Sequence, residues 1–179
     1  MIYYWFRMGR ILLSSSLSSP IAIDDELTSS FRVRALDCDG LQVMAHSQYA
    51  IYMDFARWAQ VTRTGFIRAA IRNGWAPIVG SQKIIYRKPL RRWSPFKVRV
   101  SCVGWDEKWA YYLHLFEQHC KIKAIGAIKT MVWKKERAVP MERVLKELKA
   151  NRMEMVPPVW ILDMFERDHE ILHRFLNHR

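Results

Sequence analysis

The sequence contains no run of apolar residues long enough to span a membrane. A transmembrane helix needs about 20 consecutive apolar residues, and charged residues interrupt every candidate stretch of this 179-residue chain. Its three cysteines are far apart, without the paired spacing of a zinc site or a disulfide framework. We therefore expect no membrane-spanning segment, and a reducing, cytoplasmic compartment.

Acidic residues are also scarce, with 17 Asp and Glu against 29 Lys and Arg and a formal net charge of +12. Between Phe55 and Trp105 there is no acidic residue at all, while eleven basic residues occur. Such an excess favours an anionic partner, for example nucleic acid, a lipid headgroup or a phosphorylated cofactor. No nucleic-acid recognition motif accompanies the basic run, so we do not expect nucleic acid to be that partner.

Hydrophobic residues make up 50% of the chain and aromatic residues 13%, which excludes disorder for most of its length. The Ser-rich stretch 14–19 predicts a linker. We therefore divide the chain into a leader at 1–26, one folded domain at 27–135 and a helical C-terminal extension at 136–179. Residues 1–13 combine aromatic side chains with two arginines, which suits either a peripheral contact with the inner membrane surface or packing on a protein surface.

Hydrophobic periodicity predicts an α+β fold. Residues that alternate in polarity or are β-branched predict strands at 31–36, 78–87, 96–103, 109–117 and 122–133. Apolar residues three and four apart predict helices at 47–64, 66–72, 141–150 and 161–176. Only the helix at 47–64 is long enough to cover the sheet, so we expect an antiparallel sheet wrapped around it.

The segment between the first strand and this helix carries a candidate reactive site. Asp39 lies in the turn, and His46 and Ser47 lie where the helix begins, so a carboxylate and an imidazole meet backbone N–H groups that favour negative charge. A carboxylate, an imidazole and backbone N–H donors placed together could catalyse nucleophilic attack on a carbonyl carbon. Asp39 could equally be a simple turn former and His46 an ordinary polar residue, while Asp37 is the more structural of the two aspartates.

The same segment resembles the signature of the hot-dog-fold acyl-CoA thioesterases of the 4-hydroxybenzoyl-CoA thioesterase type. That signature is Asp-x-Asp, a short turn, and His-x-x-Tyr leading into a long helix that ends near Ala-Arg. Asp39, His46, Tyr49, Ala56 and Arg57 match it in order and spacing. The resemblance implies a hot-dog fold, in which an antiparallel sheet wraps one long helix, with Asp39 and His46 as the catalytic pair. It also implies that Met44, Ser47 and Tyr49 form the oxyanion site and acyl cleft.

The rest of the chain is more similar to another branch of the thioesterase superfamily, which has bacterial and membrane-associated animal members. The shared features are the leader, DFARW at 54–58, YRKPLRRW at 86–93 and GWDEKW at 104–109. One position departs from this branch, because its usual His-Met-Asn-Asn turn reads Val43-Met44-Ala45-His46 here.

This resemblance implies an acyl-CoA thioesterase of fatty acid metabolism, acting as a homodimer or homotetramer. We expect the following cluster to bind the phosphates of coenzyme A, because arginine presents paired donors to phosphate: Arg87, Lys88, Arg91 and Arg92. A solvated basic surface is the alternative for that cluster. A non-catalytic acyl-thioester or lipid-binding protein at a membrane surface is the alternative for the whole chain.

We expect no metal and no cofactor other than the coenzyme A of the substrate. HEILH at 169–173 matches the His-Glu-x-x-His pattern of zinc proteases, but a catalytic site needs a third ligand and few residues follow. We therefore interpret it as part of a polar C-terminal helix.

Overall fold

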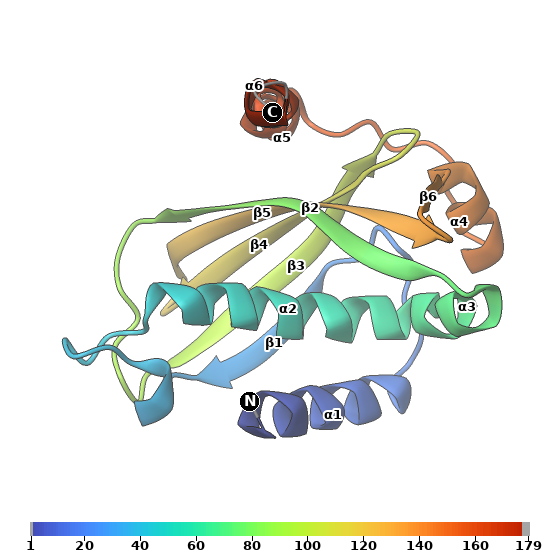
Figure 1. The fold of residues 1–179 in the computed structure, drawn as a ribbon. Helices are drawn as coiled ribbons and strands as arrows, with labels where there is room; N and C mark the ends of the chain where they lie inside the picture. The colour runs from blue at the N-terminus through green and yellow to red at the C-terminus, as the bar shows by residue number, and fades with distance from the viewer. Residues whose placement is uncertain (1, 177–179) are drawn as a thin grey trace.

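The structure, a computed structural model, describes residues 2–176. A six-stranded antiparallel sheet forms the body of the molecule, in the order β1-β3-β4-β5-β2, and β6 pairs with the end of β5 (Figure 1). The strands are β1 Leu27–Arg32, β2 Ala76–Tyr86, β3 Pro95–Trp105, β4 Ala110–Gln118, β5 Lys121–Lys134 and β6 Arg137–Val139. The predicted strand order, one strand before the long helix and a run of strands after it, is confirmed.

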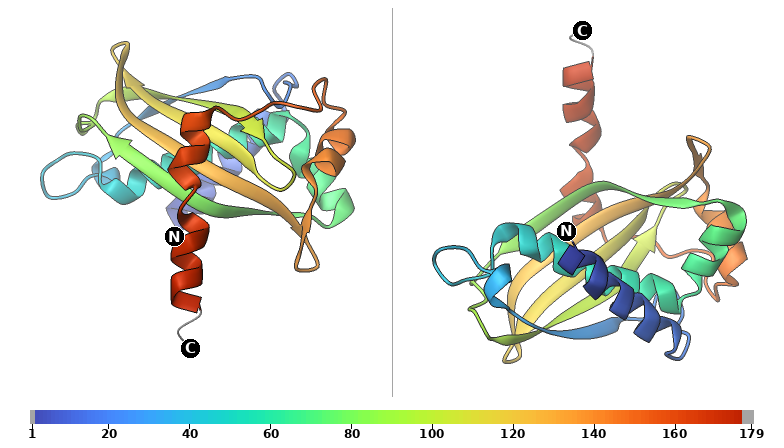
Figure 2. Two further views of the ribbon diagram at one scale, coloured as in Figure 1. Left: turned by 90° about the horizontal axis from the view of Figure 1, so that it is seen from above. Right: turned by 60° about the horizontal axis from the view of Figure 1, so that its bottom comes forward.

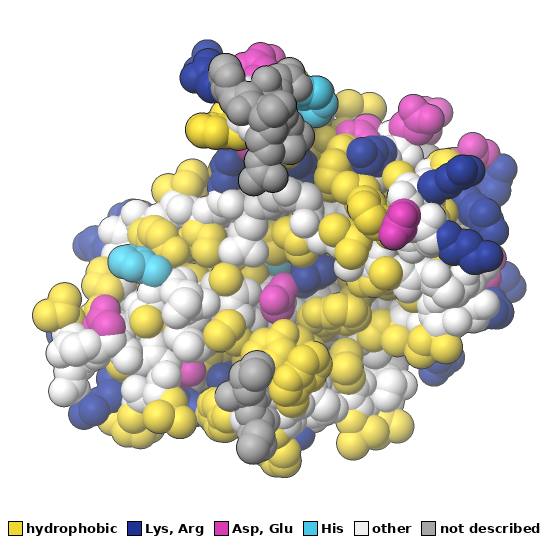
Figure 3. All heavy atoms as spheres, viewed as in Figure 1, with side chains coloured by type: hydrophobic (Ala, Val, Ile, Leu, Met, Phe, Trp, Pro, Cys, Tyr) yellow, Lys and Arg dark blue, Asp and Glu magenta, His cyan; other side chains and the backbone are white. Residues whose placement is uncertain are grey.

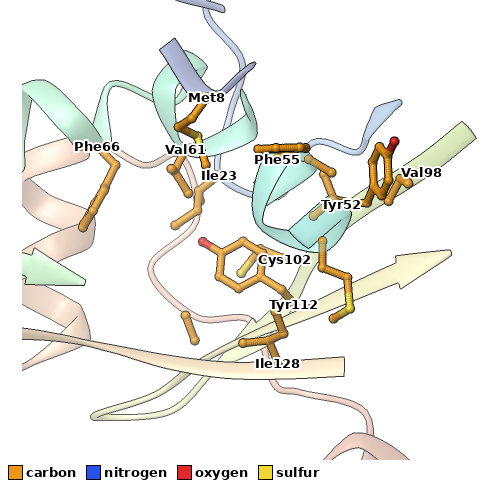
Figure 4. Close-up of a cluster of buried hydrophobic side chains, with 14 of the residues drawn as sticks. Met8, Ile23, Tyr52, Phe55, Val61, Phe66, Val98, Cys102, Tyr112 and Ile128 are labelled. Atoms are coloured by element: carbon orange, nitrogen blue, oxygen red, sulfur yellow. The ribbon is translucent and has the colours of Figure 1, made fainter. Parts of the chain in front are cut away.

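Helix α2, His46–Arg63, lies in the concave face of this sheet, as predicted (Figure 1). Tyr52 projects from α2 toward β3, whereas Phe55 packs on the side of α2 that α1 covers (Figure 4). The helix ends at Thr64, where Gly65 adopts a positive φ of 79° and lets the chain turn into α3, Phe66–Asn73. The period-two strands therefore bury their apolar faces on α2.

Helix α1, Ile2–Ser16, packs along the outer side of α2 (Figure 2). The linker predicted at 14–19 is wrong at its start, because α1 continues through Ser16. The hydroxyls of Ser14 and Ser16 donate to backbone carbonyls one turn earlier, which satisfies their polar groups within the helix. No helix among residues 2–176 has both the length and the hydropathy to cross a bilayer.

The first strand also ends earlier than predicted, at Arg32 instead of residue 36, and Ala35–Asp37 forms a 3-10 turn. The cause is the Asp37 side chain, whose Oδ2 accepts a hydrogen bond from the Arg34 N–H at 2.8 Å and closes the turn. This local bond competes with extension of the strand.

The Asp37 carboxylate is 2% exposed and joins three segments of the chain. Tyr52 on α2 donates its hydroxyl to Oδ2 at 2.6 Å, and the Arg7 guanidinium of α1 lies 3.7 Å from Oδ1. Arg7 also lies over the rings of Tyr52 and Phe55, 4.7 and 4.6 Å from their centroids. Asp37 therefore holds α1, α2 and the turn before the candidate site together, in the structural role predicted for it.

The C-terminal segment crosses to the outer face of the sheet after α4, Met141–Leu148. The helix predicted at 161–176 is two helices, α5 Val159–Phe165 and α6 Asp168–Leu176, separated by a two-residue turn. Gly104 permits the crossing, because a Cβ there would lie 2.6 Å from the backbone of Pro157. Ile161 and Phe165 of α5 are buried on this outer face against Tyr111 and Ala127.

His114 of β4 is fully buried beneath α2, and neither ring nitrogen has a hydrogen-bond partner of normal geometry among the described residues. Burial, with a smaller contribution from the Arg57 charge, lowers the pKa of His114 to about 3; backbone groups of Gly126 and Met53 offset this only in part. The folded protein therefore holds a neutral imidazole at any pH above that value.

We expect His114 to make the protein acid-sensitive. The pKa of His114 is lower in the folded protein than the value of about 6.5 expected in the unfolded chain. The unfolded chain therefore binds the extra proton, and the stability of the folded protein falls as the pH drops below 6.5. Between pH 7 and pH 4.5 this group alone should cost about 2.5 kcal/mol. Urea unfolding at both pH values should show that His114→Leu loses about this much less stability on acidification than the parent. An identical pH dependence in both proteins would contradict the assignment.

Tyr52→Phe should lower the free energy of unfolding by about 1.5–3 kcal/mol, the usual worth of a hydrogen bond to a charged group. The phenylalanine ring retains the packing, while Asp37 loses its 2.6 Å partner. Tyr4→Phe is the matched control, because Tyr4 stacks on Phe55 and its hydroxyl has no hydrogen bond among the described residues. Chemical denaturation should find the control within about 0.5 kcal/mol of the parent; equal losses in both variants would refute the Asp37 anchor.

Candidate functional site

The turn before α2 and the loop between β2 and β3 meet at one end of the molecule (Figure 1). The Met44 N–H donates to the Leu90 carbonyl at 2.8 Å, and the Arg92 N–H donates to the Gln42 carbonyl at 3.0 Å. Val43 and Arg91 form an isolated β-bridge between these bonds. The structure thus brings the turn that leads into the long helix and the loop that carries the basic cluster into direct backbone contact.

Asp39 lies at the exposed tip of this turn. Its Oδ1 accepts a hydrogen bond from the Leu41 N–H at 2.9 Å, and its own N–H donates to the Val43 carbonyl at 3.0 Å. Within residues 2–176 no hydrogen bond joins Asp39 to His46. The carboxylate therefore closes the turn, and its second oxygen is open to solvent for other chemistry.

His46 and Ser47 begin α2, and both are exposed. No side chain caps the start of the helix, which has no acidic residue in its first turn. The first N–H groups of a helix have no partner inside it, and the helix dipole makes this end positive. The start of α2 therefore presents donors to a developing negative charge beside the imidazole of His46.

A cluster of aromatic side chains packs against His46. The ring of Tyr86 is 5.0 Å from the rings of both His46 and Tyr49, and Tyr49 also contacts Phe116. Tyr49 is 2% exposed, and its hydroxyl oxygen accepts a 3.3 Å bond from the Leu90 N–H. Burial raises the pKa of Tyr49, so the phenol is neutral at pH 7.

Met44, the other predicted cleft residue, is buried at 3% exposure. Sequence reasoning missed Tyr86, although a signal was present. Tyr86 is the last residue of β2, directly before the basic cluster, so any strand that brings this cluster to the helix start must bring Tyr86 as well.

The four residues of the basic cluster are all exposed, but they do not face the same way. Arg87 donates through Nη1 to the Ile122 carbonyl at 3.1 Å, which turns its guanidinium toward the β4–β5 hairpin. The Arg92 guanidinium lies 5.6 Å from the centre of the Trp93 ring. The backbone contacts with the turn place Arg91 and Arg92 beside Val43 and Gln42, close to Asp39.

A separate cavity of about 40 Å³ lies between the C-terminal half of α2 and the sheet. Its lining is mainly apolar, with Tyr112 and the buried Arg57, whose guanidinium donates to Asp54 at 2.7 Å. The volume suffices for a water molecule but is too small for an acyl chain. No predicted site residue lines it, so the candidate site is the exposed surface around the start of α2.

The His-Glu-x-x-His segment lies on α6, where the Nε2 atoms of His169 and His173 are 3.0 Å apart on an exposed surface. Among residues 2–176 there is no group of three or more side chains that could hold a metal ion. A zinc-protease site would need such a third ligand.

Comparison with curated proteins identifies relatives of moderate similarity. Protein THEM6 of Xenopus laevis is 32% identical over 114 residues, which are 63% of this chain and 54% of the relative. Protein THEM6 of Danio rerio is 33% identical over 132 residues, 73% of this chain and 63% of the relative. The matched region thus spans little more than half the length of these relatives.

Solved structures share the fold at low sequence identity. The YbaW probable thioesterase of Escherichia coli superposes with a TM-score of 0.64 at 17% identity, covering 69% of this chain and 96% of its own. The hypothetical protein SAV2348 of Staphylococcus aureus, solved in complex with CoA, gives a TM-score of 0.61 at 12% identity over 73% of this chain and 85% of its own.

The family model of the thioesterase-like superfamily matches residues 33–149. The match begins just after β1 and includes strands β2 to β6 together with the elements that build the candidate site, which are the turn, α2 and the basic cluster. With its antiparallel sheet curled around one long helix, this chain belongs to the thioesterase-like superfamily and has the hot-dog fold.

Proposed function

We propose that this protein is an acyl-CoA thioesterase that hydrolyses an acyl-CoA to the free acid and coenzyme A. The observation that carries the proposal is the uncapped start of α2, which follows the Asp39 turn directly, while the same turn is in backbone contact with the loop of the basic cluster. Family membership supports thioester chemistry at this position.

In the proposed reaction the thioester carbonyl oxygen accepts hydrogen bonds from the first N–H groups of α2, at His46 and Ser47. These donors stabilise the oxyanion that forms when the carbonyl carbon is attacked. Asp39 takes a proton from the attacking water, and the C–S bond then breaks to release the thiolate of coenzyme A, which is protonated. His46 orients the carboxylate or assists the proton transfer, and Tyr49 and Met44 line the acyl cleft.

The basic cluster would bind the phosphates of the coenzyme A moiety. Arg91 and Arg92 are the best placed, because their backbones contact the turn of Asp39, whereas Arg87 is directed at the β4–β5 hairpin. Lys88, which is exposed beside them, adds a point charge. Among the solved neighbours, the Staphylococcus aureus protein in complex with CoA supports this part of the proposal.

The active unit would be a homodimer formed along β2. This strand is an edge of the sheet, and its outer side has no pairing partner among residues 2–176. Three of its apolar side chains are exposed: Ile78, Val79 and Ile85. Hydrophobic side chains are visible across the face that carries α2 and β2 (Figure 3). Pairing with β2 of a second copy would remove the edge and cover the cleft beside Tyr86.

A second candidate function is acyl-thioester or lipid binding at a membrane surface, without hydrolysis. Two observations favour it. The Asp39 carboxylate is engaged in closing its turn, and the outward face of α1 exposes Trp5, Phe6 and Leu13 at 63–66%. Aromatic and apolar side chains on one face of a helix beside arginines suit a contact with lipid.

Asp39→Asn should abolish acyl-CoA hydrolysis and leave the fold intact. The asparagine oxygen can still accept the hydrogen bond from Leu41, so the turn persists while the base is lost. Release of free thiol from short, long and aromatic acyl-CoAs measures activity, and circular dichroism checks the fold. Unchanged turnover would refute Asp39 as the base, and a parent protein without turnover on any of these substrates would favour the binding function.

His46→Ala should cost less than Asp39→Asn in the same assay, because the helix N–H groups still polarise the carbonyl. Loss of one oxyanion donor typically reduces the rate about 10²–10³-fold, and His46→Ala removes no backbone donor. A larger loss from the histidine would reverse the two roles.

Arg91→Gln combined with Arg92→Gln should raise KM for acyl-CoA, but not for the matching pantetheine thioester, which lacks the nucleotide. The effect should shrink at high salt, since charges at the surface are screened over about 8 Å at physiological ionic strength. Arg68→Gln with Arg137→Gln is the control pair, since both arginines are exposed on other elements. Equal shifts in KM for both substrates would show a disturbed acyl cleft instead of a lost phosphate site.

A further inference from the structure

The C-terminal helices carry a stripe of residues that starts buried and ends exposed. Residues spaced by four, three, four and three lie on one face of a helix. The stripe consists of Ile161, Phe165, Asp168, Leu172 and Phe175. Ile161 and Phe165 are 0% and 5% exposed on the outer face of the sheet, whereas Leu172 and Phe175 are 60% and 73% exposed.

The stripe becomes exposed where the sheet ends. Asp168, at its midpoint, forms an ion pair at 2.8 Å with Lys129 of β5 and another at 3.2 Å with Lys83 of β2, the edge strand. Beyond Asp168, α6 continues past β2 and leaves the molecule (Figures 1 and 2). Leu172 and Phe175 therefore face the plane in which a neighbouring sheet would continue, and none of residues 2–176 covers them.

The turn between α5 and α6 preserves this direction. Glu166 has helical φ and ψ angles of −54° and −46°, and the Ile171 N–H donates to the Arg167 carbonyl at 3.0 Å, as within a helix. Helix α6 thus continues in nearly the same direction as α5. The sheet of this chain fixes its first half, and the ion pairs at Asp168 fix its midpoint.

We propose that α6 packs on the outer face of the sheet of a second copy of this chain, reciprocally across a two-fold axis. The inference rests on the homodimer of the proposed function. When β2 pairs antiparallel with its own copy, a two-fold axis perpendicular to the sheet keeps the outer faces of both sheets on the same side. Each α6 then lies above the β2 strand of the other copy, with Leu172 and Phe175 pointing down.

The dimensions agree with this arrangement. The nine residues of α6 extend about 13 Å at 1.5 Å per residue, and neighbouring strands are about 4.8 Å apart. Because Asp168 at its start lies over β5 and β2 of its own chain, the rest of the helix reaches over about two strands of the second sheet. On that surface Ile85, two residues along β2 from Lys83 and thus on the same face, is 56% exposed and offers an apolar contact.

Packing of each α6 helix on the other copy would also add buried interface area that strand pairing alone does not provide. Stable interfaces bury about 1,200–2,000 Å² in total, and a single pair of edge strands contributes mainly backbone hydrogen bonds. The exposed apolar side chains of both α6 helices, Ile171, Leu172 and Phe175, would supply hydrophobic contact.

The test uses the full-length protein. Leu172→Ser combined with Phe175→Ser should raise the dimer dissociation constant at least tenfold in sedimentation equilibrium, with an unchanged circular dichroism spectrum. The control pair, Val156→Ser with Val159→Ser, removes similar apolar surface at positions that are 84% and 72% exposed but lie outside the stripe. The control should leave the dissociation constant unchanged.

A photo-crosslinking arm locates the contact. Replacing Phe175 with p-benzoylphenylalanine should give a covalent dimer after irradiation, with the linked peptide on β2 or β5 of the second copy, and Val159 replaced in the same way should give none. Crosslinks only within one chain, or a dimer that the serine variants do not weaken, would overturn the role of α6 and leave the proposed dimer standing. A parent protein that is monomeric at 100 µM yet hydrolyses acyl-CoA would overturn both interfaces but not the enzymatic function.

Discussion

The burial of one carboxylate, Asp37, is the constraint on which the rest of the arrangement depends. A charge removed from water is costly unless hydrogen bonds and an opposite charge surround it. Here the partners come from three places: the backbone of Arg34, the hydroxyl of Tyr52 and the guanidinium of Arg7. Satisfying Asp37 therefore requires the 3-10 turn, α2 and α1 to be in place together.

That requirement fixes the geometry of the candidate site. The Asp37 carbonyl also accepts a 2.9 Å bond from the Ala45 N–H, directly before α2 begins. The residues between them, including Asp39, are thus held in a closed turn whose ends cannot separate. Backbone bonds to Leu90 and Arg92 attach the same turn to the β2–β3 loop. A site on an exposed loop gains, in this way, the rigidity of the core beneath it.

The core under α2 is unusually polar for its depth. His114 is buried without a hydrogen bond of normal geometry, and Arg57 is 6% exposed with its Nε unpaired among the described residues. Each such group reduces stability. His114 lies on β4 beneath α2, and Arg57 of α2 lines the small cavity near the end of that helix.

The sequence alone determined strands β1 to β5, helices α2 to α4 and their order, but not α1, β6 or the division between α5 and α6. Periodicity of two and of 3.6 residues is set by which side chains must avoid water, so it revealed the long helix and the strands around it. The match of Asp39, His46 and Tyr49 to a known signature located the candidate site. Local patterns failed where a single side chain decides the backbone, as at Asp37, whose hydrogen bond ends β1 early.

Only the tertiary structure decided which residues far apart in sequence come into contact. Contacts such as Tyr86 with His46, Arg92 with Gln42 and Asp168 with Lys83 join residues 40 to 85 positions apart, and no local period records them. The tertiary structure also decided which apolar side chains of the C-terminal helices are buried. The sequence showed an amphipathic C-terminal segment, but only the sheet and its free β2 edge show which part of the apolar stripe is covered. The reason is that exposure depends on the elements that surround a residue and not on the residue itself.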